Sequence, residues 1–157
     1  MSAKGIRDID VIRTFVLQGT LNFTRYFFKI RQKRKFVIGK HHREIAAALD
    51  KVLCGEITRL IINIAPRYGK TELAVKNFIA EGLAINPKAK FIHLSYSDDL
   101  ARDNSRGVQD IINEPEYRRI FPATIPTSTN TKKWYTTEGG GLYAVSSAGQ
   151  VTGLSLI

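Results

Sequence analysis

The sequence is short of cysteine, of long apolar runs and of acidic residues, and each shortage excludes a class of protein. Cys54 is the only cysteine, so the chain has no disulfide framework and no cysteine-based metal site. Because it closes a predicted helix beside Leu53, we expect it to be a buried bystander. No apolar run approaches the ~18 residues of a membrane span, and no signal-peptide pattern opens the chain. These absences predict a protein of a reducing cytoplasm with no membrane partner.

The scarcity of acidic residues leaves a strongly basic chain. Lys and Arg total 24 against 14 Asp and Glu, so the formal net charge is +10 and the pI is near 9.9. Such an excess predicts salt-sensitive DNA binding without sequence preference, and a solvated basic surface explains the composition as well. The densest basic segment is either a linker or the DNA contact. Its candidate residues are Arg31, Lys33, Arg34 and Lys35.

The length of 157 residues, with 43% hydrophobic and 24% charged residues, predicts one ordinary globular domain. Apolar periodicity predicts helices over residues 9–17, 21–30 and 41–53, with Gly19 and Gly55 ending the first and the last. The aromatic stripe of the second helix is interpreted as packing rather than as a base-stacking platform.

One stretch carries the chemistry of the sequence. The apolar run from Leu60 to Ile64 predicts a buried strand, and Gly69-Lys70-Thr71 then opens an amphipathic helix. A glycine lets the backbone approach a phosphate, Lys70 would neutralise its β and γ groups, and the Thr71 hydroxyl would ligate Mg²⁺. The first glycine of the full phosphate-loop motif is replaced by Ile64. An ordinary strand–turn–helix therefore remains an alternative.

The remaining chain predicts further α/β structure. Residues 90–95 indicate a second buried strand, and Ser97 would cap a helix whose first turn holds Asp98 and Asp99. The helix dipole explains this acidic pair better than a Mg²⁺ site does. Residues 58–113 thus predict a β-α-β-α unit with a parallel sheet. Residues 134–137 and 142–145 predict a hairpin across a glycine turn, and 154–157 could begin another strand.

The adjacent residues His41 and His42 raise the question of a metal site. Neighbours on a helix point about 100° apart, and the sequence offers no evident third ligand. A metal site is therefore rejected here.

The loop Ala65-Pro-Arg-Tyr-Gly-Lys-Thr-Glu72 resembles the P-P-R-H-G-K-S-E loop of the large terminase subunits of tailed bacteriophages. The resemblance continues through Ser95-Tyr-Ser97, Glu116-Tyr117 and Phe121-Pro122 to the Gly149–Gly153 loop, and covers roughly residues 36–153. It implies a P-loop NTPase (RecA-like) fold, α/β with a doubly wound, mostly parallel sheet. That sheet would be incomplete. A short N-terminal helical and basic segment (1–35) would precede the partial ATPase domain (36–157).

The resemblance also implies a function. The protein would bind ATP and Mg²⁺ and help to power packaging of double-stranded DNA into proheads in the cytoplasm of a bacterial host. Its partners would be the terminase small subunit and the portal protein, and a homo-oligomer is compatible with the family. Arg67 and Lys70 would act on the phosphates, Thr71 would hold Mg²⁺ through ATP, and Phe36 and His41 would lie near the adenine. The phosphate-loop residues are Pro66, Arg67, Tyr68, Gly69, Lys70, Thr71 and Glu72.

The sequence departs from the family where catalysis would be completed. In the family the loop like Gly149–Gly153 leads into a strand with an acidic Walker B pair and a catalytic glutamate, and a nuclease domain follows. This sequence ends before them, so we expect the front part of a terminase that binds ATP better than it hydrolyses it. The alternatives are a fragment of a P-loop helicase or remodelling ATPase, and a non-catalytic DNA-binding assembly module with a vestigial loop.

Overall fold

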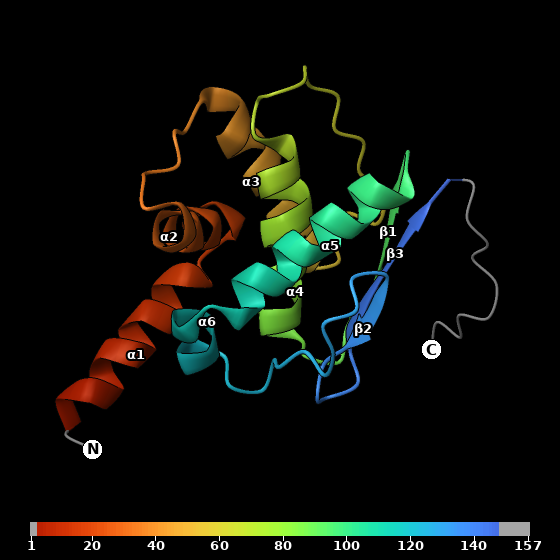
Figure 1. Ribbon diagram of the computed structural model, residues 1–157. Helices are drawn as coiled ribbons and strands as arrows, with labels where there is room; N and C mark the ends of the chain where they lie inside the picture. The colour runs from red at the N-terminus through yellow and green to blue at the C-terminus, as the bar shows by residue number, and fades with distance from the viewer. Residues whose placement is uncertain (1–2, 148–157) are drawn as a thin grey trace.

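The computed structural model describes residues 3–147, with side chains from residue 8 onward, and shows a mixed α/β fold. Within this range there are six α-helices, one π-helical segment and a three-stranded mixed sheet. The elements in chain order are α1 (Ala3–Val16), α2 (Thr20–Gln32), α3 (Lys40–Leu53), η1 (Glu72–Asn77), α4 (Phe78–Ile85), β1 (Lys90–Ser95), α5 (Asp98–Asn113), α6 (Pro115–Ile120), β2 (Lys133–Tyr135) and β3 (Gly141–Ser146). Figure 1 shows the helices grouped to one side of the sheet.

The sheet has the strand order β1-β3-β2. β1 and β3 run parallel, with Phe91 opposite Leu142, and β2 pairs antiparallel with β3, with Trp134 opposite Leu142. The predicted hairpin is thereby confirmed. Its turn includes Gly139 at φ +89°, a left-handed conformation that glycine adopts without steric cost. The strand expected over 154–157 and the Gly149–Gly153 loop lie outside the described residues.

The strand predicted over residues 60–64 is wrong. This segment carries no strand, and residues 58–65 form no backbone hydrogen bond with the rest of the described chain. Ile61 is 94% exposed. An apolar run becomes a strand only when a neighbouring strand accepts its hydrogen bonds, and the described sheet offers none to this segment. The predicted β-α-β-α unit therefore begins with an unpaired, extended segment.

The predicted helices are confirmed, with two differences: α1 begins at Ala3, six residues before the predicted start, and the helix after the loop begins with the π-helical segment η1. Ser97 caps α5 as expected, because its hydroxyl oxygen accepts the Leu100 N–H at 3.3 Å. The short helix α6 was not predicted, although Pro115 stands at its first turn, where a proline needs no hydrogen-bond acceptor. Among residues 3–147 no helix is long and apolar enough to cross a membrane.

Cys54 does not lie in the core. It is the C-cap residue of α3 and is exposed, so the expectation of a buried bystander is wrong. The chain leaves the helix at this point, with Gly55 at φ +78°, and turns into the exposed segment before the loop. A residue beside a helix end can therefore face solvent even when its neighbours in the sequence are apolar.

One buried cluster joins the N-terminal helices to the rest of the chain. Phe23 and Phe27 of α2 stack with Tyr117 of α6 and Phe121, with ring centroids 4.6–6.4 Å apart. The Tyr117 hydroxyl donates a 2.8 Å hydrogen bond to the carbonyl of Ala80 in α4. Phe23 and Phe27, two rings of the aromatic stripe of α2, thus pack in the core, as the sequence predicted for that stripe. α1 and α2 consequently share a core with the segment that follows residue 36.

A carboxylic acid is buried beside this core. Glu81 of α4 is 1% exposed, and its Oε2 has no hydrogen-bond partner among the described residues. Burial raises its pKa to about 8, while a hydrogen bond with Thr20 opposes and the charge of Asp50 adds to that rise. Thr20 in turn donates through its N–H and its hydroxyl to Asp50, each at 2.8 Å. The structure therefore holds Glu81 protonated at neutral pH.

We predict that the free energy of unfolding falls as the pH rises from 7 to 8.5. In this range the unfolded chain has already lost the Glu81 proton, whereas the folded protein still holds it and must release it. This contribution is fully present below pH 4.5, the ordinary pKa of the carboxyl, and is lost as pH passes about 8. The change between pH 7 and 8.5 should be about 1 kcal/mol in urea unfolding. Glu81→Gln should remove it, whereas Glu138→Gln, at an exposed position, should leave it unchanged. An equal pH dependence in both variants would contradict the assignment.

Candidate functional site

The loop between the extended segment and η1 forms a concave backbone. Arg67 and Gly69 have positive φ values of 69° and 72°, while Tyr68 between them does not. When the sign of φ alternates between successive residues, their N–H groups turn toward the same side of the backbone. Such an arrangement is an anion-binding nest. A Cβ at Gly69 would also lie 2.8 Å from His42 Nε2, so only glycine fits there. The positive φ of Arg67 is a strained conformation for a residue with a side chain.

A helix begins directly behind this nest. The Leu73 N–H donates to the Gly69 carbonyl at 3.0 Å, the first backbone bond of the helix. The N–H groups of the first turn have no intrahelical acceptor and carry the positive end of the helix dipole. Lys70 and Thr71, in that turn, are exposed. The local geometry thus offers backbone donors, an ammonium group and a hydroxyl at one place.

The loop encloses a hollow of about 450 Å³, which we call the phosphate-loop hollow. Of the seven loop residues named from the sequence, all except Tyr68 line it. Its lining residues are Ile64, Ala65, Pro66, Arg67, Gly69, Lys70, Thr71 and Glu72. The charge along this lining is two cations against one carboxylate, which suits an anionic ligand.

The first turns of the helix behind the loop are π-helical. Over η1 the backbone hydrogen bonds reach five residues back instead of four, so that the Phe78 N–H donates to the Leu73 carbonyl. The Asn77 side-chain amide donates to the Glu72 carbonyl at 2.8 Å and to its carboxylate at 2.9 Å. A side chain that captures a backbone carbonyl in this way displaces the regular ladder. The irregularity therefore has an identifiable cause in Asn77, which is fully buried.

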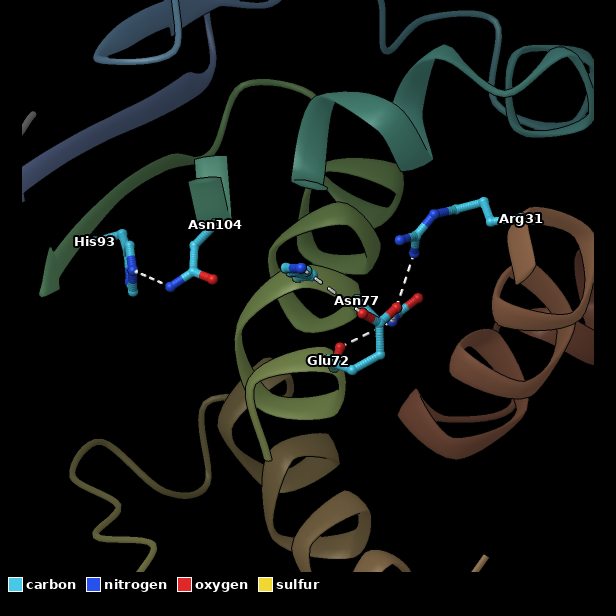
Figure 2. A network of polar contacts seen from close by, with 6 residues as sticks. Arg31, Glu72, Asn77, His93 and Asn104 are labelled. Carbon is cyan, nitrogen blue, oxygen red and sulfur yellow. Dashed lines mark hydrogen bonds and ion pairs between the residues drawn. The ribbon is translucent and has the colours of Figure 1, made fainter. Parts of the chain in front are cut away.

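Glu72 is the centre of a polar network that reaches the N-terminal helices (Figure 2). Its carboxylate accepts a 2.8 Å hydrogen bond from Arg31 of α2 and lies 4.0 Å from Lys76. The side chains of Arg31 and Glu72 are only 9% and 17% exposed. Arg31 is thus paired within the fold, and this ion pair withdraws its charge from the surface. DNA binding by the basic segment stays a prediction. Lys33, Arg34 and Lys35 are exposed.

A second hollow, of about 530 Å³, adjoins the loop and is called here the aromatic hollow. It brings together the two residues expected near an adenine, Phe36 and His41, with Tyr68 of the loop. The ring of Phe36 meets Phe28 edge-on at 5.2 Å, and the ring of His41 meets Tyr68 edge-on at 5.5 Å. Arg67, Gly69 and Glu72 line both hollows. The structure therefore places an aromatic wall next to the cationic loop.

His42, which the sequence did not single out for this role, holds the loop in place. The Gly39 N–H donates to His42 Nδ1 at 2.9 Å, so that nitrogen is unprotonated. The proton then resides on Nε2, which donates to the Tyr68 carbonyl at 2.9 Å. Burial lowers the pKa of His42, in agreement with this neutral tautomer. His41 contacts only the ring of Tyr68 in this loop, whereas His42 binds its backbone carbonyl, and no sequence pattern carries that distinction.

Asp98, the first residue of the acidic pair after β1, has a structural partner. The Asp98 carboxylate accepts the Ser146 N–H at 3.2 Å, and its hydrogen bonding to Ser146 lowers the pKa of Asp98. It thereby joins the start of α5 to the end of β3. Nearby, Asn104 of α5 donates to His93 of β1 at 3.1 Å (Figure 2). Among the described residues no three His, Cys, Asp or Glu side chains gather as a metal-binding group.

Comparison of the chain with protein-family models, with curated proteins and with solved structures finds no match.

We predict that Arg31→Met lowers the free energy of unfolding by about 2 kcal/mol, because it leaves the largely buried Glu72 carboxylate with Lys76, at 4.0 Å, as its nearest cation and with the neutral Asn77 amide. Chemical denaturation measures this cost. The double variant Arg31→Met/Glu72→Gln should recover part of it. The control is Arg106→Ala, which breaks an exposed ion pair with Asp103 and should cost less than about 1 kcal/mol. Equal costs at Arg31 and Arg106 would contradict a structural role for the buried pair.

Proposed function

We propose that the chain binds ATP with Mg²⁺ as the front part of a terminase large subunit, the ATPase of a motor that packages double-stranded DNA. The single observation that supports this is the junction of the phosphate-loop hollow with the aromatic hollow through Arg67, Gly69 and Glu72. A nucleotide has the same two-part chemistry, an anionic triphosphate joined to an aromatic base. The phosphates would lie on the nest and the helix start, and the base against Phe36, His41 and Tyr68.

Each cationic and hydroxyl group of the loop has a distinct role in this proposal. Lys70 neutralises the β and γ phosphates, and the Thr71 hydroxyl is the ligand that the chain offers to Mg²⁺. Arg67 is exposed and held at a positive φ on the rim of both hollows. A fixed guanidinium there would stabilise the negative charge that develops on the transferred phosphoryl group. Mg²⁺ itself would supply charge neutralisation between the phosphates when bound.

The finer fold and the partners belong to the same proposal. A RecA-like sheet is supported by the parallel pairing of β1 and β3. Double-stranded DNA, a terminase small subunit and a portal protein are the partners that the resemblance implies. The net charge of +10 supports a polyanionic partner.

We predict that Lys70→Ala weakens MgATP binding at least tenfold in calorimetric titration, because it removes the ammonium group at the phosphates. Inorganic tripolyphosphate, which lacks a base, should show the same loss. Phe36→Ala should weaken ATP binding but leave tripolyphosphate binding unchanged, since it acts on the base alone. Lys88→Ala, at an exposed position away from both hollows, is the control. Equal affinities of Lys70→Ala and the parent chain would exclude the loop as a phosphate site.

We also predict that the purified chain binds ATP without rapid turnover. The carboxylate that lines the phosphate-loop hollow is Glu72, and Arg31 and Asn77 already engage it. A group that orients or deprotonates the attacking water typically contributes ~10²–10⁴-fold, so turnover without one should be slow. Steady-state phosphate release measures it. A kcat of about 1 s⁻¹ or more would show that a carboxylate assigned here to structure is catalytic, or that another subunit supplies one.

A further inference from the structure

The positive charge of the chain is concentrated in one segment. Between residues 11 and 43 there are nine Lys or Arg and no Asp or Glu, while the rest of the chain has 15 cations against 14 carboxylates. Nearly the whole net charge of +10 therefore originates from the end of α1, from α2, from the linker to α3 and from the first turn of α3. Within residues 8–147, two of these nine cations form ion pairs. Arg31 pairs with Glu72 in a largely buried contact, whereas Lys40 pairs with Glu44 at 3.9 Å on the surface.

The fold gathers part of this charge around a third hollow. α2 ends at Gln32, and its C-cap residue Lys33 has a left-handed φ of 54°, which turns the chain back toward the helix. The linker and α2 then enclose a hollow of about 280 Å³, which we call the α2 hollow. Its lining consists of three cations, three aromatic rings and one aliphatic residue. These are Phe15, Arg25, Tyr26, Lys29, Lys35, Phe36 and Ile38.

The rings of the α2 hollow are held in place by their neighbours. The Tyr26 hydroxyl donates to Glu116 at 2.8 Å, and its ring meets Phe27 edge-on at 5.3 Å. Phe36 meets Phe28 and His42 at 5.2 and 4.9 Å. Glu116 is also paired with Arg119 at 2.6 Å, so its charge is compensated. Phe15, 41% exposed, completes the aromatic lining. A ligand here would meet ordered aromatic surfaces under a net positive potential.

We propose that the α2 hollow binds single-stranded nucleic acid, with one base against the rings and the flanking phosphates on Arg25, Lys29 and Lys35. Stacking on aromatic side chains combined with cations that follow the backbone is the general chemistry of single-strand recognition. The bases of a duplex are stacked inside it and cannot enter a hollow at the lower end of ligand-pocket volumes, about 300 Å³. Binding of a duplex would use the cations, which contact phosphates, but it would give the aromatic rings no role.

This inference goes beyond the proposed function and does not depend on it. The α2 hollow shares Lys35, Phe36 and Ile38 with the aromatic hollow but none of the loop residues from Pro66 to Thr71. It can therefore be tested in the full chain with no nucleotide present, and in Lys70→Ala protein. Loss of ATP binding in that variant with single-strand binding intact would separate the two proposals.

The experiment measures fluorescence anisotropy of a labelled 20-nucleotide oligothymidylate at several salt concentrations. We expect binding that weakens as salt rises, and a loss of at least tenfold in the triple variant Arg25→Ala/Lys29→Ala/Lys35→Ala, with a shallower salt dependence. The matched control is Lys51→Ala/Lys88→Ala/Arg102→Ala, which removes the same charge from exposed positions outside the three hollows. It should retain the affinity of the parent chain within about twofold. Circular dichroism would verify that both variants are folded.

A second arm separates stacking from charge alone. An oligomer of the same length that lacks bases should bind at least fivefold more weakly than oligothymidylate, and Phe15→Ala should abolish that preference. Three results would overturn the proposal: equal affinity for the base-free oligomer, duplex DNA that binds more tightly than the single strand through the same three cations, or binding to vesicles with anionic lipid but not to oligothymidylate. Equal losses in the two triple variants would likewise overturn it.

Discussion

The ion pair between Arg31 and Glu72 is the interaction on which the rest of the site depends. It joins α2 to the first turn of the helix behind the loop, two elements that are 41 residues apart in the sequence. Asn77 binds the same carboxylate and the Glu72 carbonyl, and thereby stabilises the π-helical turn. Because both charges are largely buried, neither partner can be lost without leaving the other uncompensated. The direction in which the loop faces is consequently set by the N-terminal helices.

The three hollows form a connected surface because they share walls. Arg67, Gly69 and Glu72 belong to both the phosphate-loop hollow and the aromatic hollow. Lys35, Phe36 and Ile38 belong to both the aromatic hollow and the α2 hollow. A displacement of the linker at Phe36 would therefore change the shape of both the aromatic hollow and the α2 hollow. His42 provides the second anchor of this surface, since its ring holds the Tyr68 carbonyl from the start of α3. The linker that carries Phe36 thus lies between the proposed nucleotide and the proposed single-stranded nucleic acid.

Local sequence patterns predicted the helices, the hairpin and the composition of the loop. Gly69, Lys70 and Thr71 stand where the sequence placed them, at the start of a helix, and Phe36 and His41 do reach the loop. Two interpretations failed for one shared reason. The strand over 60–64 lacks a partner strand, and Cys54 faces solvent instead of the core. For the same reason the sequence did not show that Arg31 faces Glu72 instead of solvent. Each outcome depends on a neighbour that is distant in the sequence.

The sequence by itself determined the helical periodicity, the glycine positions, the cationic loop and the concentration of charge between residues 11 and 43. These follow from propensities and charges that act over a few residues. Only the tertiary structure decided which of two adjacent histidines holds the loop, which arginine is buried, and which rings of α2 remain at the surface. Those choices depend on packing between elements, because burial makes a polar group's free energy depend on the specific partner it meets.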